Sequence, residues 1–114
     1  MKKIIAVALT AFALNATAEE SFWIHNGFST GEQFLNMPEA EKLAFSMGTV
    51  NGMLLAPLFG APKERMLWIE TCVLGMTDSQ VTAIFEKYLR DNPSRWHQTP
   101  HAPMYSALKQ ACPK

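Results

Sequence analysis

The pair of cysteines constrains the fold more than any other feature of this sequence. Cys72 and Cys112 are the only cysteines in the 114-residue chain. An even number of cysteines in an exported protein indicates a disulfide, which here would close a loop of about 40 residues and stabilise the fold by about 4 kcal/mol. The alternative interpretation makes Cys72 a catalytic nucleophile with His97 as its base.

The N-terminus has the features of a secretory signal peptide over Met1–Ala18. Positive charge at Lys2–Lys3 precedes an apolar stretch over residues 4–14, and Ala16–Ala18 supplies the small residues of a cleavage site. We therefore expect cleavage after Ala18 and one periplasmic domain over residues 19–114. An apolar stretch of about 11 residues is shorter than the roughly 20 that span a bilayer, so no membrane anchor is expected after cleavage.

Charge and size restrict the partners of the expected mature chain. Removing the signal peptide leaves eight basic and ten acidic residues, a net charge of −2. This balance lacks the basic surplus that neutralises phosphates, which argues against a nucleic acid partner. A domain of about 96 residues buries only roughly 60–65% of its unfolded surface, so a disulfide or a partner is needed to support its core.

Apolar residues at helical spacing predict an all-α fold, a small single-domain bundle of four to five helices held by one disulfide. Thr30 and Thr77 are predicted N-caps, the second within a capping box completed by Gln80. The disulfide is expected to join the start of the fourth helix to the end of the last. The predicted helices cover residues 31–36, 38–56, 62–75, 77–92 and 100–112.

The long helix is predicted to carry two stripes side by side. The apolar stripe, expected to face the core, consists of Leu43, Met47, Val50 and Leu54. The stripe of small residues consists of Ala44, Gly48, Gly52 and Ala56. Each glycine inside a helix costs roughly 1 kcal/mol relative to alanine, which favours close packing of another helix or backbone along this stripe over a chance arrangement.

The segment before the first predicted helix is apolar but has no clear period. Phe22, Trp23 and Ile24 are followed by a turn signal at Asn26–Gly27. We expect Glu19–Phe28 to form an arm that packs onto the domain.

No catalytic or metal-binding set is apparent, so an enzyme, a metal site and a cofactor are not expected. His97 and His101 have the spacing of a helical zinc pair, but Pro100 between them opposes a helix there, and a zinc site needs three or four ligands. These residues and His25 are interpreted as solvated loop histidines. Glu86 and Arg90 fit a surface pair four residues apart on a helix.

Two connecting segments hold more apolar and aromatic residues than a loop requires. One runs from Met53 to Phe59, and the other is Arg95-Trp96-His97. Tryptophan and arginine are typical of interface hot spots, but Trp96 could equally fill the core of a small domain. The Leu54–Phe59 run would form a partner or dimer face if exposed, and core if buried.

The spaced residues of the C-terminal half, with two earlier segments, resemble the Rap/Tai family of periplasmic immunity proteins. The later residues are Cys72, Gly75-Met76-Thr77, Gln80, Tyr88-Leu89, Asn92-Pro93, His97, Ala107-Leu108 and Cys112-Pro113, and the earlier ones are Phe28-Ser29-Thr30-Gly31, Phe45-Ser46-Met47-Gly48 and Gly52. Bacteria use this family against type VI secretion amidase toxins. Ser46 stands where the family often has a cysteine, so one disulfide is expected here where relatives can have more.

The resemblance implies an all-helical, often dimeric protein that binds a cell-wall amidase effector and blocks its active-site groove. Residues outside the family's spaced pattern would then choose the partner. We expect these to be Leu58, Phe59, Lys63, Arg65, Trp68, Arg95 and Trp96. The alternative function is a small periplasmic chaperone of the acid-stress type, opened at low pH by protonation of acidic groups and histidines.

Overall fold

The computed structural model describes residues 27–112, and this part of the chain is all-α. The predicted signal peptide and most of the predicted arm lie outside the described residues. Five α-helices and two short 3-10 helices follow one another in the described part. Their bounds are α1 Gly31–Leu35, α2 Glu39–Leu54, η1 Ala56–Phe59, α3 Lys63–Val73, α4 Asp78–Asp91, η2 Pro93–Arg95 and α5 His101–Ala111. The expected all-α bundle is confirmed.

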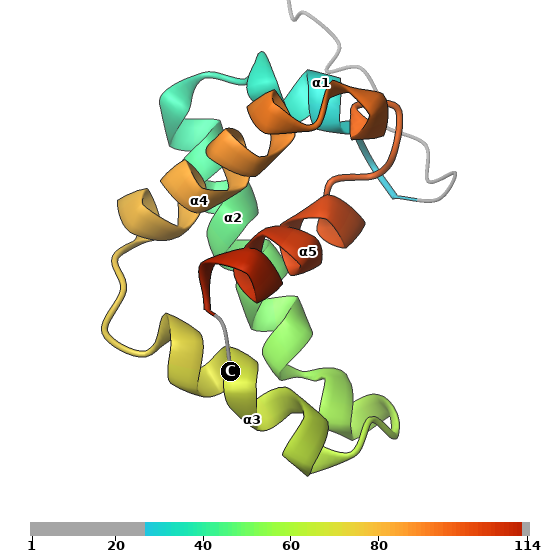
Figure 1. Cartoon of the computed structure of the whole chain (residues 1–114), viewed down its shortest axis with the longest axis vertical. Coiled ribbons are helices and arrows are strands. Elements are labelled where there is room, and N and C mark those ends of the chain that lie inside the picture. Colours follow the sequence, from blue (N-terminus) through green and yellow to red (C-terminus); the bar gives the residue numbers. More distant parts are fainter. Residues whose placement is uncertain (1–26, 113–114) are drawn as a thin grey trace, which may run out of the picture.

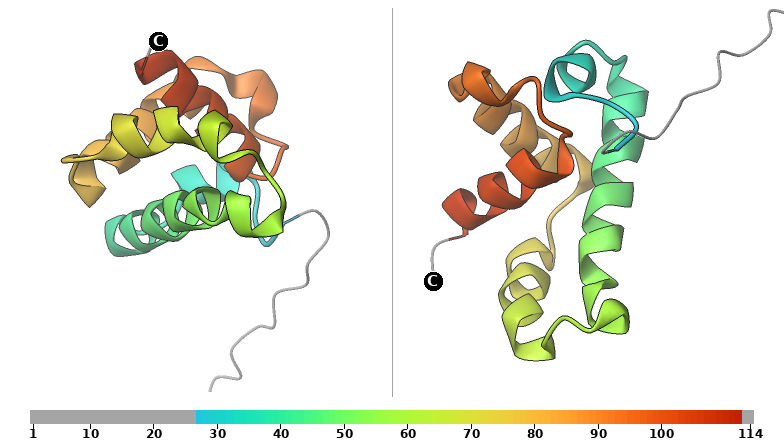
Figure 2. Two further views of the ribbon diagram at one scale, coloured as in Figure 1. Left: turned by 90° about the horizontal axis from the view of Figure 1, so that it is seen from below. Right: turned by 90° about the vertical axis from the view of Figure 1, so that its right-hand side faces the viewer.

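The longest helix, α2, organises the others. Figures 1 and 2 show α1, α4 and α5 gathered beside one half of α2, with α3 lying beside its other end. The core lies where α2, α4 and α5 meet. Its fully or nearly buried apolar residues are Phe34, Val50, Ile69, Val81, Phe85, Leu89, Met104, Ala107 and Leu108.

Two capping boxes fix the starts of α1 and α4. The Thr77 hydroxyl accepts the Gln80 N–H at 3.1 Å, and the Gln80 side chain accepts the Thr77 N–H at 2.9 Å. Thr30 and Gln33 make the same reciprocal pair. Each box satisfies amide groups that the first helical turn leaves without partners. The predicted box at Thr77 is confirmed, and α1 has a second one.

The buried face of α2 is displaced from the predicted apolar stripe. Val50 is buried as expected, but Met47 is 46% exposed and Leu54 is 37% exposed. The most deeply buried row instead contains Lys42 and Ser46, four residues apart. Lys42 can occupy this face because its ammonium lies 3.2 Å from the Glu86 carboxylate on α4. The buried face of α2 is therefore rotated relative to its hydrophobic pattern, and the ion pair with Glu86 compensates the burial of the Lys42 charge.

The expectation of close packing along the glycines of α2 is wrong for the described residues. Gly48 and Gly52 are exposed, and a Cβ atom added at either one would meet no atom within 4 Å. The helix that packs most extensively on α2 is α4, and Lys42, which is buried like Ser46 and Val50, pairs with Glu86 of α4. The glycine face of α2 is open in the described structure.

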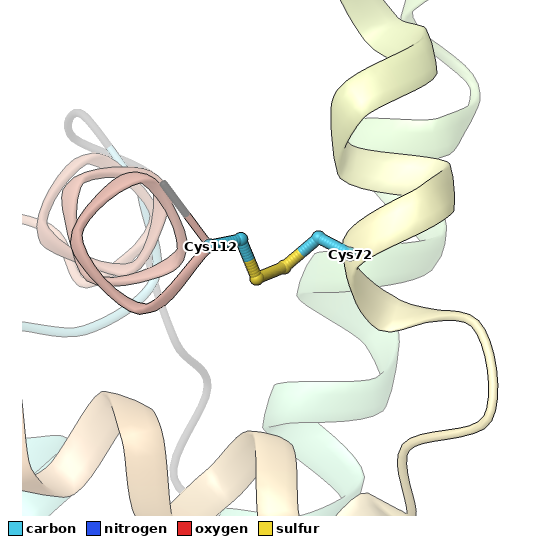
Figure 3. The surroundings of a disulfide bond; sticks show 2 residues. All are labelled: Cys72 and Cys112. Carbon is cyan, nitrogen blue, oxygen red and sulfur yellow. A yellow bond between two sulfur atoms is a disulfide. The ribbon is translucent and has the colours of Figure 1, made fainter. Parts of the chain in front are cut away.

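The disulfide between Cys72 and Cys112 is confirmed, with the Cα atoms 5.7 Å apart. Figure 3 shows it joining α3 to the end of α5. Cys72 lies in the last turn of α3, so the expectation that the bond reaches the start of the fourth helix is wrong. Three residues after Cys72, Gly75 takes a positive φ of 82° and turns the chain away from α3. The disulfide therefore attaches α3 to α5.

Candidate binding surface

The end of α2, the η1 turn and α3 together present an apolar surface to solvent. Leu58 is 79% exposed, Phe59 is 86% exposed and Leu67 on α3 is 56% exposed. Leu55, at the end of α2, is also exposed. These residues come from elements that contact one another, and exposed large apolar side chains in one region are typical of surfaces that contact another molecule. We call Leu55, Leu58, Phe59 and Leu67 the apolar tip.

Local sequence chemistry fixes the backbone of the apolar tip. Pro57 stands in the first turn of η1, and Gly60 ends it with a φ of 97° that favours glycine. Leu58 N–H donates to the Leu55 carbonyl at 2.9 Å, and Ala61 N–H donates to the Ala56 carbonyl at 3.2 Å. The turn that exposes Leu58 and Phe59 is therefore a defined hydrogen-bonded structure, which reduces the entropy cost of ordering it on binding.

Charged side chains border the apolar tip on α3. Lys63 and Arg65 are exposed in the first turn of this helix, together with Glu64. Exposed charges around an apolar centre make the polar rim that is usual in protein interfaces and guide the orientation of a partner more than they add affinity. The arrangement is suited to protein recognition.

Four of the seven predicted partner residues thus come together at this end of the molecule. They are Leu58, Phe59, Lys63 and Arg65, on η1 and the start of α3. Trp68 also lies on α3, but it is half-buried and packs edge-on against Tyr105 of α5, with ring centroids 5.6 Å apart. Trp68 therefore supports the position of α3 beside α5.

Arg95 and Trp96 lie away from this group, in the connection between α4 and α5. The Arg95 guanidinium donates to the Tyr88 hydroxyl at 2.7 Å and to the Ser106 hydroxyl at 2.8 Å. The Trp96 indole N–H donates to the Leu89 carbonyl, and its ring packs against the core. The polar groups of both side chains therefore form hydrogen bonds within the protein, which attach the connection to α4 and, through Arg95, to α5.

The sequence prediction missed Leu67 as a surface residue. Ile69, two positions further along α3, is fully buried. Because residues two apart on a helix point to nearly opposite sides, burial of Ile69 places Leu67 on the solvent side. The signal was present in the spacing, but the choice of the buried residue depended on where α2 and α5 lie.

Residues 27–112 contain no cluster of side chains that could hold a metal ion. His97 and His101 are both exposed, and no group of three or more His, Cys, Asp or Glu side chains gathers there around a common point. His25 lies outside the described residues. Cys72 is held in the disulfide, so the structure contains no free thiol at that position for His97 to activate.

Within the same described part, no helix has the length and apolarity needed to cross a membrane. Comparison with known proteins gave no match to a family model, to a curated protein or to a solved structure.

Proposed function

We propose that this protein is a periplasmic immunity protein that binds and inhibits a type VI secretion peptidoglycan amidase effector. The signal-peptide features of Met1–Ala18 support export, and the resemblance to the Rap/Tai family supports the choice of target. In this role the protein protects the producing cell and its siblings from the amidase. It acts by binding and carries out no reaction of its own.

The observation that carries the proposal is the exposure of Leu58 and Phe59 on an ordered turn. Burying a leucine or phenylalanine side chain that was exposed is worth about 1.5–3 kcal/mol. Two adjacent side chains of this kind can therefore supply much of the energy of a specific interface when they enter a cleft. A substrate groove on an amidase is such a cleft, and a turn filling it excludes the peptidoglycan.

The disulfide supports the proposal because it fixes α3 beside α5. Lys63 and Arg65 lie in the first turn of the same helix. A surface held in its binding shape loses little conformational entropy when the complex forms, which favours tight binding. An oxidising compartment such as the periplasm is where a structural disulfide persists.

The test measures inhibition of the amidase encoded by the neighbouring gene, with release of peptide from purified peptidoglycan as the readout. We expect the unsubstituted protein to inhibit at a one-to-one ratio. Phe59→Asp and Leu58→Asp place a charge at the centre of the interface and should raise the inhibitory concentration by roughly 30-fold or more, the size of a hot-spot loss.

The matched control is Leu74→Asp. Leu74 is 80% exposed, like Phe59, but lies after α3 on the connection to α4. This variant should inhibit as well as the unsubstituted protein. Equal loss for all three variants, or no loss for any of them, would contradict the assignment of the apolar tip as the binding surface.

A general chaperone is the alternative, favoured by exposed apolar residues outside the tip, such as Met47 and Leu74. A chaperone of this kind suppresses aggregation of many unfolded proteins at acidic pH, whereas an inhibitor does not. Light scattering of two unrelated aggregating proteins at pH values of about 3 and 7 distinguishes the functions.

A further inference from the structure

A second apolar feature lies on the glycine face of α2, away from the apolar tip. A groove of about 640 Å³ lies along this face, open to solvent and lined also by Phe28 and by the start of α5. Its volume lies within the range of sites that hold a small molecule or a few side chains. We call it the glycine groove; it is lined by Gly27, Phe28, Phe45, Gly48, Thr49, Gly52, Met53, Pro100 and His101.

Gly48 and Gly52 carry no side chains, so the bottom of the glycine groove is formed by the backbone of α2. No atom lies within 4 Å of a Cβ added at either position. Each glycine inside a helix costs about 0.5–1 kcal/mol relative to alanine, and nothing in residues 27–112 uses the space that they leave. A bulky apolar group placed over them would bury the walls formed by Phe45 and Met53.

We propose that the occupant is the chain's own preceding segment, with Phe22, Trp23 and Ile24 inserted into the glycine groove. The segment joins the described structure at Gly27, which itself lines the groove. Gly27 has a φ of 129°, and a Cβ there would lie 2.6 Å from the Thr99 methyl carbon. The chain therefore enters at the rim of the groove through a position that only glycine can fill.

Backbone hydrogen bonds at the start of α1, shortly after Gly27, attach this part of the chain to the domain. Gly31 N–H donates to the Gln98 carbonyl at 2.9 Å, and Glu32 N–H donates to the Trp96 carbonyl at 3.1 Å. These bonds fix the start of α1 against the connection that leads into α5. The position of the rim, and hence the point from which the preceding segment starts, is set by backbone hydrogen bonds.

The segment is long enough to extend along the groove from Gly27. Trp23 precedes Gly27 by four residues, which reach about 13–14 Å when extended. Gly48 and Gly52 are one turn apart on α2, about 6 Å along its axis. An extended segment that starts at Gly27 is therefore longer than the spacing between the two glycines. Burying three consecutive bulky apolar side chains is favourable, and the groove is an apolar surface directly beside the point where the segment joins the domain.

The test combines substitutions in both partners. Mass spectrometry first establishes that the purified protein contains residues 19–26. Trp23→Ala should lower the Tm by about 4–8 °C, because the apolar contact is lost. Glu20→Ala, in the same segment, and Leu58→Ala, at an exposed apolar position elsewhere, serve as controls and should leave the Tm unchanged.

The substitution Gly48→Leu is expected to shift the Tm in opposite directions, depending on whether the groove is filled or empty. In an empty groove, leucine in place of a helical glycine raises the Tm, because leucine is the better helix former. With the segment inserted, leucine displaces Trp23, so Gly48→Leu should lower the Tm of the unsubstituted protein and raise that of the Trp23→Ala variant. An increase of the same size in both backgrounds would overturn the proposal.

Nuclear Overhauser effects supply the direct readout. Contacts between the Trp23 indole protons and the Met53 methyl group are expected within one molecule. A sample that mixes labelled and unlabelled copies distinguishes the source: contacts seen only between copies mean that a second molecule's segment fills the groove, and this result overturns the intramolecular assignment. Absence of any contact from Trp23 to α2 overturns it as well.

Discussion

Trp68 of α3 packs edge-on against Tyr105 of α5, with ring planes inclined at 72°. One helical turn further along α3, Cys72 is bonded to Cys112. Ile69, between these two contacts, is the only fully buried residue of α3. The helix that carries Lys63 and Arg65 is thus attached to the domain along one side, where Met66 and Val73 also pack against the core, and the disulfide is its covalent attachment.

Reduction of the disulfide should therefore loosen α3 more than the other helices. In the double variant Cys72→Ser/Cys112→Ser, we expect hydrogen exchange to accelerate over residues 63–73 while α4 keeps its protection. The loss of loop closure should also lower the free energy of unfolding by up to about 4 kcal/mol. An unchanged exchange rate in α3, or equal acceleration in every helix, would show that the attachment is made elsewhere.

The Lys42–Glu86 pair should stabilise the packing of α2 on α4. The Lys42 side chain is 10% exposed and that of Glu86 is 22% exposed, so replacing Glu86 leaves a nearly buried ammonium without its nearest partner. Glu86→Gln should lower the free energy of unfolding by about 1–3 kcal/mol, less than for a fully buried pair because water still reaches Glu86. Urea unfolding followed by circular dichroism measures the loss.

A matched control is available on the same helix. Asp91 pairs with Lys87 at 2.6 Å, but both side chains are more than half exposed. Asp91→Asn should cost less than about 1 kcal/mol, as exposed pairs do. Equal effects for Glu86→Gln and Asp91→Asn would show that the Lys42 contact contributes no more than a surface pair.

The N-cap of α4 should be a measurable source of stability. Thr77→Ala removes the hydroxyl that accepts the Gln80 N–H, and the expected loss is about 1 kcal/mol. For a domain of this size the Tm falls by about 4–8 °C, which calorimetry resolves. Ser79→Ala, at an exposed position in the same helix, is the comparison and should change the Tm little. A larger effect at Ser79 would refute the capping role.

Arg95 should stabilise the fold of the protein in the absence of any partner. Its guanidinium bonds the side chains of Tyr88, Gln98 and Ser106, so Arg95→Met leaves three polar groups without this partner. We expect a loss of about 1–3 kcal/mol on unfolding in denaturant. Arg65→Met, at an exposed arginine of α3, should leave stability within about 0.5 kcal/mol. The reverse order would show that the Arg95 contacts do not support the fold.

The helix boundaries could be predicted from the sequence because their signals are local. Thr77 and Gln80 define the start of α4 by side-chain chemistry alone, and Pro57, Gly60 and Pro62 separate α2 from α3 in the same way. These residues act on backbone groups within a few positions of themselves. No knowledge of the remaining fold is needed to interpret them.

The buried face of α2 could not be predicted by the same means. The row of Lys42 and Ser46 is less hydrophobic than the row of Leu43 and Met47, so the pattern alone selects the wrong side. Lys42 is acceptable on the inner side only because Glu86, far away in the sequence, lies beside it. The exposure of Leu67 depends on tertiary packing in the same way.

The exposed apolar turn of the candidate surface could be predicted from the sequence, but the roles of two other residues could not. Leu58 and Phe59 stand out in the sequence because they are large and apolar in a turn marked by proline and glycine. Arg95 and Trp96 stand out for a similar reason, yet the structure ties their polar groups to α4 and α5. Residue type in a connection indicates an unusual position, but only the three-dimensional contacts distinguish an exposed anchor from an internal brace.

The most direct test of the proposed function is calorimetric titration of the purified, oxidised protein into the amidase encoded by the neighbouring gene. We predict a one-to-one complex with a Kd of about 1–100 nM, weakened by Phe59→Asp and unchanged by Leu74→Asp. No measurable heat of binding at several temperatures, together with full amidase activity in the mixture, would contradict the proposal that this protein is the amidase's inhibitor.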